Sequence, residues 1–239
     1  MRAIIIRGMM PIAATHDVEP FRPRTAQRLL FLCALGVLCV YRLFLVALAA
    51  QSLPPAYPRA GATKLFENDE IQVWNIAWLK GQPSPLHRHI YDLVGVYYEP
   101  GDRMIIAVDG SKRPVSTKAG DVVFQRKGVT HIEEGTSDAP LRSVFVEMKT
   151  DGAFGKVTAP PPGATAFSGK TMPALDNERV TVWDLTEASA RPARHYHPQD
   201  AVVAWIDGSG AHARFIARGT IHDDEGIGAA TRVTVFELK

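Results

Sequence analysis

The sequence HRHIYD at residues 87–92 indicates the architecture of this chain, because a related copy, HYHPQD, follows at residues 195–200. Both copies have the pattern H-x-H-x-x-D, and three further blocks repeat around it in the same order. These blocks are FENDEIQVWNIAWL (66–79) with LDNERVTVWDLTEA (175–188), KGVTHIEEG (127–135) with RGTIHDDEG (218–226), and LRSVFVEMK (141–149) with TRVTVFELK (231–239). The repeat indicates two related domains in tandem.

The repeated region is predicted to be all-β. Short runs rich in β-branched and aromatic residues alternate with turn signals such as EPGD, VDGSK and DGSG, a pattern typical of a sandwich, barrel or jelly roll. The second copy is shorter, since 42 positions separate His89 from His131 but only 25 separate His197 from His222. The missing length equals one β-hairpin and corresponds to RMIIAVDGSKRPVSTK in the first copy.

The repeated histidines are the candidate metal ligands. Residues two apart on a strand point to the same face, so each H-x-H pair can aim two imidazoles into one barrel interior. A third histidine from a distant strand completes each set. Three nitrogen ligands leave positions open on a metal ion, which suits chemistry or ligand binding better than a closed structural site. The two sets are His87, His89 and His131, and His195, His197 and His222.

Residues 81–101 resemble the first motif of the cupin family, G-x5-H-x-H-x(3,4)-E-x6-G, and residues 120–131 are similar to the start of the second, G-x5-P-x-G-x2-H-x3-N. The resemblance implies two tandem RmlC-like double-stranded β-helix barrels, or jelly rolls, of which the second is shortened. It also implies that the first histidine set holds one divalent transition metal (Fe, Mn, Zn, Ni or Cu). By the internal repeat, the second set is its counterpart. The run HRHIYDLVGVYY further resembles small cupins linked to β-alanine degradation.

The carboxylates depart from the family pattern. The glutamate ligand of the family falls at Leu93 or Val94, so a site that adds a carboxylate to the histidines is not predicted. Asp92 and its repeat equivalent Asp200 are instead predicted to orient an imidazole from behind the ligands. Glu133 is expected to be a solvated turn charge.

An apolar stretch precedes the repeats. Residues 29–50, LLFLCALGVLCVYRLFLVALAA, contain 13 Leu, Phe and Val residues, which contribute about −4 to −8 kcal/mol to membrane insertion against about +3 kcal/mol for the single arginine. The A-x-A pattern at residues 47–49 favours a cleaved signal peptide, and hence an exported, periplasmic protein. A retained membrane anchor and a buried helix of a cytoplasmic protein stay open. Cys33 and Cys39 both lie here, so no thiol is expected beyond it.

The predicted organisation places the basic excess of the chain at its N-terminus. The formal charge is +2, yet six of the 27 Lys and Arg residues precede residue 51, and the remainder gives no electrostatic footprint for nucleic acid. The expected segments are a signal peptide or anchor (1–50), a linker (51–62), cupin domain 1 (63–150), a second linker (151–172) and a shortened cupin-like domain 2 (173–239).

Two functional classes follow from these features, and a third stays open. A three-histidine cupin site resembles those of certain dioxygenases, which favours a mononuclear Fe or Mn oxygenase acting on a small organic substrate. A non-enzymatic module of the cell envelope that binds a small ligand or metal is the alternative, and a structural protein is the third possibility. The expected partners are a small molecule and a second copy in a homodimer, unless the two barrels satisfy one another. Membrane contact is expected only through an uncleaved N-terminal segment.

Overall fold

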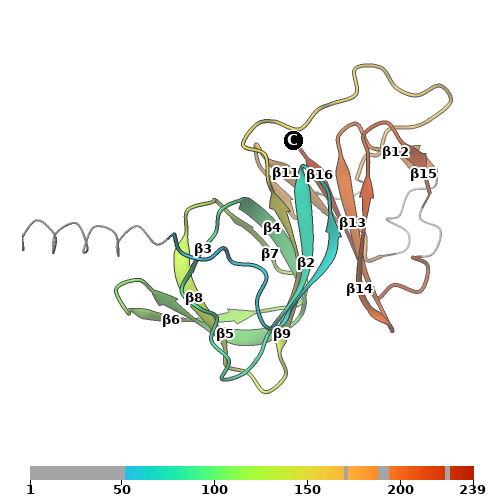
Figure 1. Cartoon of the computed structure of the whole chain (residues 1–239). Coiled ribbons are helices and arrows are strands. Elements are labelled where there is room, and N and C mark those ends of the chain that lie inside the picture. The colour runs from blue at the N-terminus through green and yellow to red at the C-terminus, as the bar shows by residue number, and fades with distance from the viewer. Residues whose placement is uncertain (1–51, 170–171, 188–193, 224–226) are drawn as a thin grey trace, which may run out of the picture. The chain divides into compact units, whose positions relative to one another are not determined.

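The computed structural model describes residues 52–169, 172–187, 194–223 and 227–239 (Figure 1). Within these ranges the chain forms strands and turns and no helix, which confirms the predicted all-β class. A helix long and apolar enough to cross a membrane is accordingly not found there. The predicted signal segment and both cysteines lie outside the described residues.

The first half folds into two antiparallel sheets with strand orders β1-β2-β9-β4-β7 and β3-β8-β5-β6. Side chains from both sheets meet in one interior, where for example Trp78 of β2 donates a hydrogen bond to Glu133 of β8. This arrangement is a double-stranded β-helix barrel. Its strands are β1 (Ala62–Glu67), β2 (Ile71–Trp78), β3 (His87–Arg88), β4 (Asp92–Glu99), β5 (Gly101–Ala107), β6 (Lys112–Thr117), β7 (Val122–Gln125), β8 (Thr130–Gly135) and β9 (Leu141–Met148).

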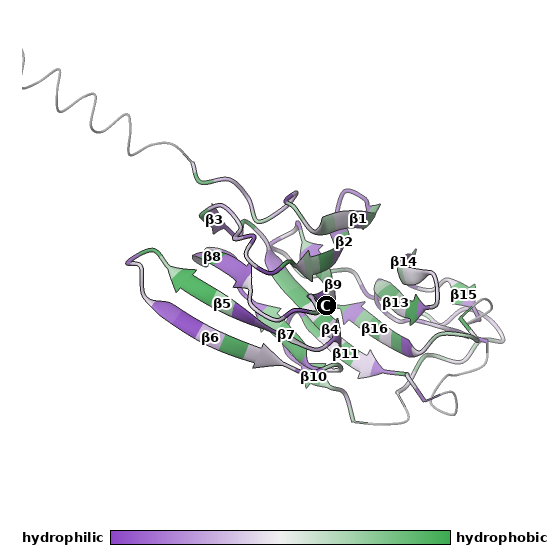
Figure 2. Cartoon of the chain, turned by 90° about the horizontal axis from the view of Figure 1, so that it is seen from below, coloured by the Kyte–Doolittle hydropathy of each residue, from purple (hydrophilic) through white to green (hydrophobic). Residues whose placement is uncertain are grey.

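The second half repeats the larger sheet with equivalent strands in the same order, β10-β11-β16-β13-β14, but its other sheet contains only β12 and β15. No strand pair in the described part of this half corresponds to the hairpin β5–β6, which Figure 2 shows in the first half with hydrophilic residues at the start of β6. The shortening predicted from the histidine spacing is this hairpin. The strands are β10 (Leu175–Asp176), β11 (Val180–Asp184), β12 (His195–Tyr196), β13 (Ala201–Asp207), β14 (Gly210–Ile216), β15 (Ile221–His222) and β16 (Arg232–Leu238).

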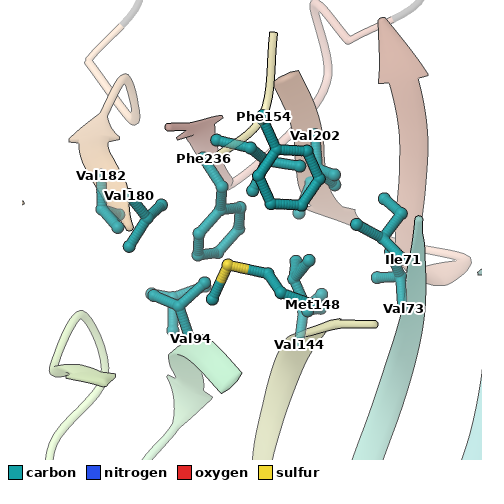
Figure 3. Packing of buried hydrophobic residues seen from close by; sticks show 14 of the residues in the cluster. Ile71, Val73, Val94, Val144, Met148, Phe154, Val180, Val182, Val202 and Phe236 are labelled. Carbon is teal, nitrogen blue, oxygen red and sulfur yellow. The ribbon is translucent and has the colours of Figure 1, made fainter. Parts of the chain in front are cut away.

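The central strands of the larger sheets are buried on both faces, because their alternate residues serve two different cores. On β2, Trp74, Ile76 and Trp78 belong to the interior of the first barrel, whereas Ile71 and Val73 belong to a second cluster on the opposite face. That cluster joins the halves, since it also contains residues of β11, β13 and β16, as Figure 3 shows. Residues 53–239 therefore form one compact unit, in which each sheet covers the outer face of the other.

The joined halves also share polar and aromatic contacts. Phe66 and Phe215 stack with ring centroids 5.7 Å apart. Arg179 of the second half is buried, lies 3.3 Å from a carboxylate oxygen of Asp92 and donates a hydrogen bond to the Thr150 carbonyl at 2.6 Å. A buried charge needs a partner. Since the partners of this arginine belong to the first half, its contacts help to fix how the two halves pack together.

Parts of both predicted linkers lie inside the barrels. Before the first barrel, Tyr57 is 4% exposed and its ring centroid lies 5.3 Å from that of Trp74. Before the second, Phe167 is 6% exposed and lies 5.8 Å from the repeat-equivalent Trp183. Each linker also forms an isolated parallel bridge beside an H-x-H pair. The structural repeat thus extends upstream of the sequence repeat, since each barrel receives one aromatic ring from the preceding segment.

The shared core predicts cooperative unfolding. Replacing Phe236, which is fully buried between the halves, by alanine should cost about 3–5 kcal/mol. Because each half contains two of the four tryptophans, fluorescence during denaturant unfolding reports on both halves. We expect one transition, shifted to lower denaturant in the variant, while Val108→Ala at a site 68% exposed should leave it unchanged. Separate transitions for the two halves would contradict a shared core.

Candidate metal centre

Strand pairing brings the histidines together in both halves. His87 on β3 lies directly opposite His131 on β8, and His195 on β12 lies opposite His222 on β15. The next inward-facing residue of each H-x-H pair supplies the third imidazole. Both predicted sets therefore meet, and in each the three candidate ligand atoms lie within 4.8 Å of one another.

The first set has the geometry of a facial metal site. The Nε2 atom of His89 lies 3.3 Å from that of His87 and 3.1 Å from that of His131. Two nitrogens that bind one ion at about 2.1 Å are about 3.0–3.4 Å apart for angles between square and tetrahedral. The three rings stand edge-on to one another, at 70°, 81° and 83°, so that three lone pairs can converge on one point.

The imidazoles of the first set are held neutral. Burial lowers the pKa of His89 to about 3, and burial also lowers the pKa values of His87 and His131. The Nδ1 atom of His87 lies 3.0 Å from the Pro85 carbonyl, an acceptor that places the proton on Nδ1 and leaves a lone pair on Nε2. Neutral imidazole with a free nitrogen is the form that binds metals. The residues present therefore fit a transition-metal ion.

The second set is less regular. The Nε2 atoms of His195 and His197 lie 3.4 Å apart, but the rings of His197 and His222 are nearly parallel, at 21°. His222 is also half-buried rather than buried, and burial lowers its pKa to about 4. Its strand β15 has two residues and only one neighbour, β12, whereas β8 is held between β3 and β5. Without a strand equivalent to β5, the strand that positions His222 is thus hydrogen-bonded on one side only.

Asp92 and Asp200 do not orient the imidazoles, which corrects the prediction. Asp92 accepts hydrogen bonds from the Lys127 backbone N–H at 2.9 Å and from Arg126 at 3.0 Å. Asp200 likewise accepts from the backbone and the guanidinium of Arg218, at 2.8 and 2.6 Å. Both carboxylates lie three residues after an inward-facing histidine, and they share the outer face of their strand with apolar residues of the joining cluster. Their role is therefore to fix the turn before β8 or β15.

The carboxylate that does contact an imidazole was missed from the sequence. Glu237 on β16 places Oε1 3.1 Å from His197 Nδ1 and accepts a hydrogen bond from Trp183 at 3.0 Å. In the first barrel the repeat-equivalent Glu147 accepts a hydrogen bond from Trp74, also at 3.0 Å. Both the tryptophan and the glutamate recur at equivalent positions of the sequence repeat, and this recurrence could have indicated the buried pair.

Glu133 is buried, not a solvated turn charge as expected. It faces the first barrel two residues after His131 and accepts a hydrogen bond at 3.2 Å from Arg59. Arg103 on β5 contributes a second guanidinium, 3.7 Å away. Although burial opposes ionisation, the charges of Arg103 and Arg59 hold the pKa of Glu133 at about 2. No pattern in the sequence indicates this cluster, because its members come from three distant segments.

Within the described ranges, no carboxylate joins either histidine set. At the family's glutamate position, Leu93 belongs to the barrel interior and Val94 to the joining cluster. Among the described residues, the candidate centre therefore offers three nitrogens.

Comparisons with known proteins concern the fold. No family model matches the sequence, and no curated protein does. Solved structures similar to the chain include a cupin domain from Bordetella pertussis (23% identity, 42% of this chain, 100% of that chain, TM-score 0.35). Also similar is a cupin-2 domain protein from Shewanella frigidimarina (18% identity, 39% of this chain, 84% of that chain, TM-score 0.30). A third similar structure is an RmlC-like cupin with a double-stranded β-helix fold from Methanocaldococcus jannaschii (18% identity, 38% of this chain, 85% of that chain, TM-score 0.30). Each covers about two fifths of this chain.

At these identities the likeness extends to the fold alone, so the assignment rests on the strand order and register described above. By those criteria, the described residues of 53–239 fold as a pair of double-stranded β-helix barrels, and in the second no hairpin equivalent to β5–β6 is found.

The buried Glu147 predicts a pH dependence of stability. Burial raises its pKa to about 7, above the ordinary value of 4.5, so the folded state favours the protonated form. Its contribution to stability is thus complete below pH 4.5 and is lost as the pH rises through 7. Glu147→Gln should remove this loss, on the order of 3 kcal/mol.

The measurement is denaturant unfolding at pH 4.5 and pH 8 in the presence of a chelator. The exposed Glu99→Gln serves as the control and should follow the wild type. If the wild type and Glu147→Gln lose stability equally between the two pH values, Glu147 is not protonated in the folded protein.

Proposed function

We propose that the chain is a metal-binding cupin-type protein whose first barrel holds one divalent transition-metal ion on His87, His89 and His131 and presents it to a small organic molecule. The main support is the convergence of three buried, neutral imidazoles, in which His89 Nε2 lies 3.3 Å from His87 Nε2 and 3.1 Å from His131 Nε2. Three protein ligands would leave coordination positions open, and a bound ion of this kind supplies Lewis-acid or redox chemistry.

The chain's own residues fix the ligand geometry. The Pro85 carbonyl and the Ser84 hydroxyl, 3.0 and 3.2 Å from His87 Nδ1, hold that ring in place. Ser84 in turn accepts a hydrogen bond from the Glu133 backbone N–H at 3.0 Å, which ties the loop before β3 to β8. The Tyr57 ring, 6.4 Å from that of His89, covers the apolar side of the set. Such outer contacts orient ligands and exclude water.

The activity we propose is that of a mononuclear Fe or Mn oxygenase acting on a small organic substrate. Three neutral imidazoles leave the charge of a divalent ion uncompensated, which supports binding of an anionic or bidentate substrate beside it. The second barrel, with its less regular set, is proposed as a partner that completes the folded unit rather than a second centre. A non-enzymatic binding module would share the metal site but would not consume dioxygen with any substrate.

Metal content tests the proposal. The full-length chain, purified after loading with Fe, Mn, Zn, Ni or Cu, should retain about one equivalent of metal by elemental analysis. His87→Ala/His131→Ala should lose it, because one remaining imidazole cannot hold the ion. The matched variant His195→Ala/His222→Ala should retain it.

Retention of metal by His87→Ala/His131→Ala with loss in the matched variant would place the centre in the second barrel and contradict the proposal. Oxygen consumption by the Fe- or Mn-loaded wild type across a panel of small organic acids then separates an oxygenase from a binding module.

A further inference from the structure

Around Glu133, the interior of the first barrel contains more positive than negative charge. The side chains of Arg59 and Arg103 are 7% and 10% exposed, and both lie beside this carboxylate. The other buried carboxyl group of this interior, Glu147, is hydrogen-bonded instead by Gln72 and Trp74. Arg103 is held between two rings, with its Cζ 4.8 Å from the Trp78 centroid and 5.1 Å from that of Tyr97. Two guanidinium groups thus share one carboxylate, and the longer of the two contacts is that of Arg103. A buried charge without a full counter-ion costs several kcal/mol.

Other buried polar atoms without hydrogen-bond partners lie in the same barrel interior. Ser143 is fully buried and lies directly opposite Tyr97 in the pairing of β4 with β9. Most buried polar groups in proteins are hydrogen-bonded, so a cluster of exceptions in one interior requires an explanation. The buried atoms without a hydrogen-bond partner here are Arg103 Nη1, Arg59 Nε, Tyr97 Oη, Ser143 Oγ and Gln125 Nε2.

The second barrel shows that the fold itself does not need these polar groups. The position of the Tyr97–Ser143 pair is taken there by Trp205 opposite Val233. Likewise, Gln125 opposite Leu93 in the first barrel corresponds to an apolar residue opposite Ala201 in the second, Ile216. Ile216 and Val233 belong to the apolar core of that barrel. The described residues of the second barrel include no counterpart of the arginine on β5, because they form no hairpin equivalent to β5–β6.

We propose that the first barrel binds a small organic carboxylate, with its anionic group held by Arg103 and Arg59 and its other end facing the open side of the His87, His89 and His131 set. The inference deepens the proposed function and rests on it for the metal end of the ligand. A planar guanidinium matches a carboxylate through paired hydrogen bonds, and the Tyr97 and Ser143 hydroxyls supply further donors. One excess positive charge matches one carboxylate.

The site sets the length of the ligand. On β8 the rows of His131 and Glu133 are two residues apart on one face, which is about 7 Å. On β5, Arg103 is paired with Gly135, which lies two residues beyond Glu133 on β8. Glu133 therefore lies between the position of Arg103 and that of His131 along this strand. A molecule of about three to five carbons with acidic groups at its ends fits this separation. Malonate, succinate and glutarate are therefore suitable probes, and the neutral diamide succinamide is the uncharged analogue of the middle one.

The experiment is isothermal titration of the full-length chain with these probes, in metal-loaded and metal-free form. We expect at least one of the dicarboxylates to bind and succinamide not to bind. Arg103→Met should weaken binding at least about tenfold, since it removes a charge-assisted pair of hydrogen bonds. This variant keeps the Arg59–Glu133 pair, so its folding should survive. Arg113→Met, an exposed position on the same hairpin, is the matched control for loss of charge and should bind like the wild type.

A second variant provides an independent test in case Arg103→Met does not fold. Ser143→Val introduces the residue type that the second barrel carries at the equivalent register position, and it should weaken binding several-fold without loss of metal. Equal binding of the dicarboxylate and succinamide, or equal affinity in wild type and Arg103→Met, overturns the inference.

The two proposals fail separately. Metal binding without charge-dependent binding of any dicarboxylate overturns the inference and leaves the metal site standing. Arginine-dependent binding of a dicarboxylate by a chain that takes up no metal overturns the proposed function, while the anion site stands.

Discussion

The arrangement of the candidate centre depends on the register between the short H-x-H strand and the strand of the later histidine. In an antiparallel pair, residues directly opposite one another point to the same face, so pairing His87 with His131 puts both imidazoles in the barrel interior. The two-residue period then adds His89 from the same chain segment. A shift of one residue would turn the opposing histidine outward, and no ligand set would remain.

The same constraint explains why the two barrels differ. The register is repeated between His195 and His222, but β15 lacks the neighbouring strand that β5 provides for β8. The third imidazole of the second barrel therefore lies less deeply buried and nearly parallel to its neighbour. The missing hairpin also removes the position of Arg103, and apolar residues fill the remaining interior. In the described part of the second half, the absence of this hairpin thus coincides with a less regular histidine set and a more apolar core, while the larger sheet covers the other barrel.

The sequence was sufficient for the all-β class, the tandem repeat, the missing hairpin and the meeting of the histidines. Each of these depends on local period or on repeated letters, which a single chain displays directly. The role of Asp92 could not be predicted, because its partners Lys127 and Arg126 lie more than 30 residues along the chain and a third, Arg179, lies in the other half. Glu133 was misjudged for a related reason: its guanidinium partners come from a predicted linker and from β5. The contribution of Tyr57 and Phe167 has no shared sequence signal, since different residues serve the same place.

A single transition-metal ion bound by His87, His89 and His131 of the first barrel can be located by anomalous diffraction. The measurement is made at the absorption edge of the loaded metal, on crystals of the full-length chain. We expect one strong peak at bonding distance from the three Nε2 atoms of the first set. A peak confined to the His195, His197 and His222 set, or its absence from both barrels in metal-saturated crystals, would contradict it.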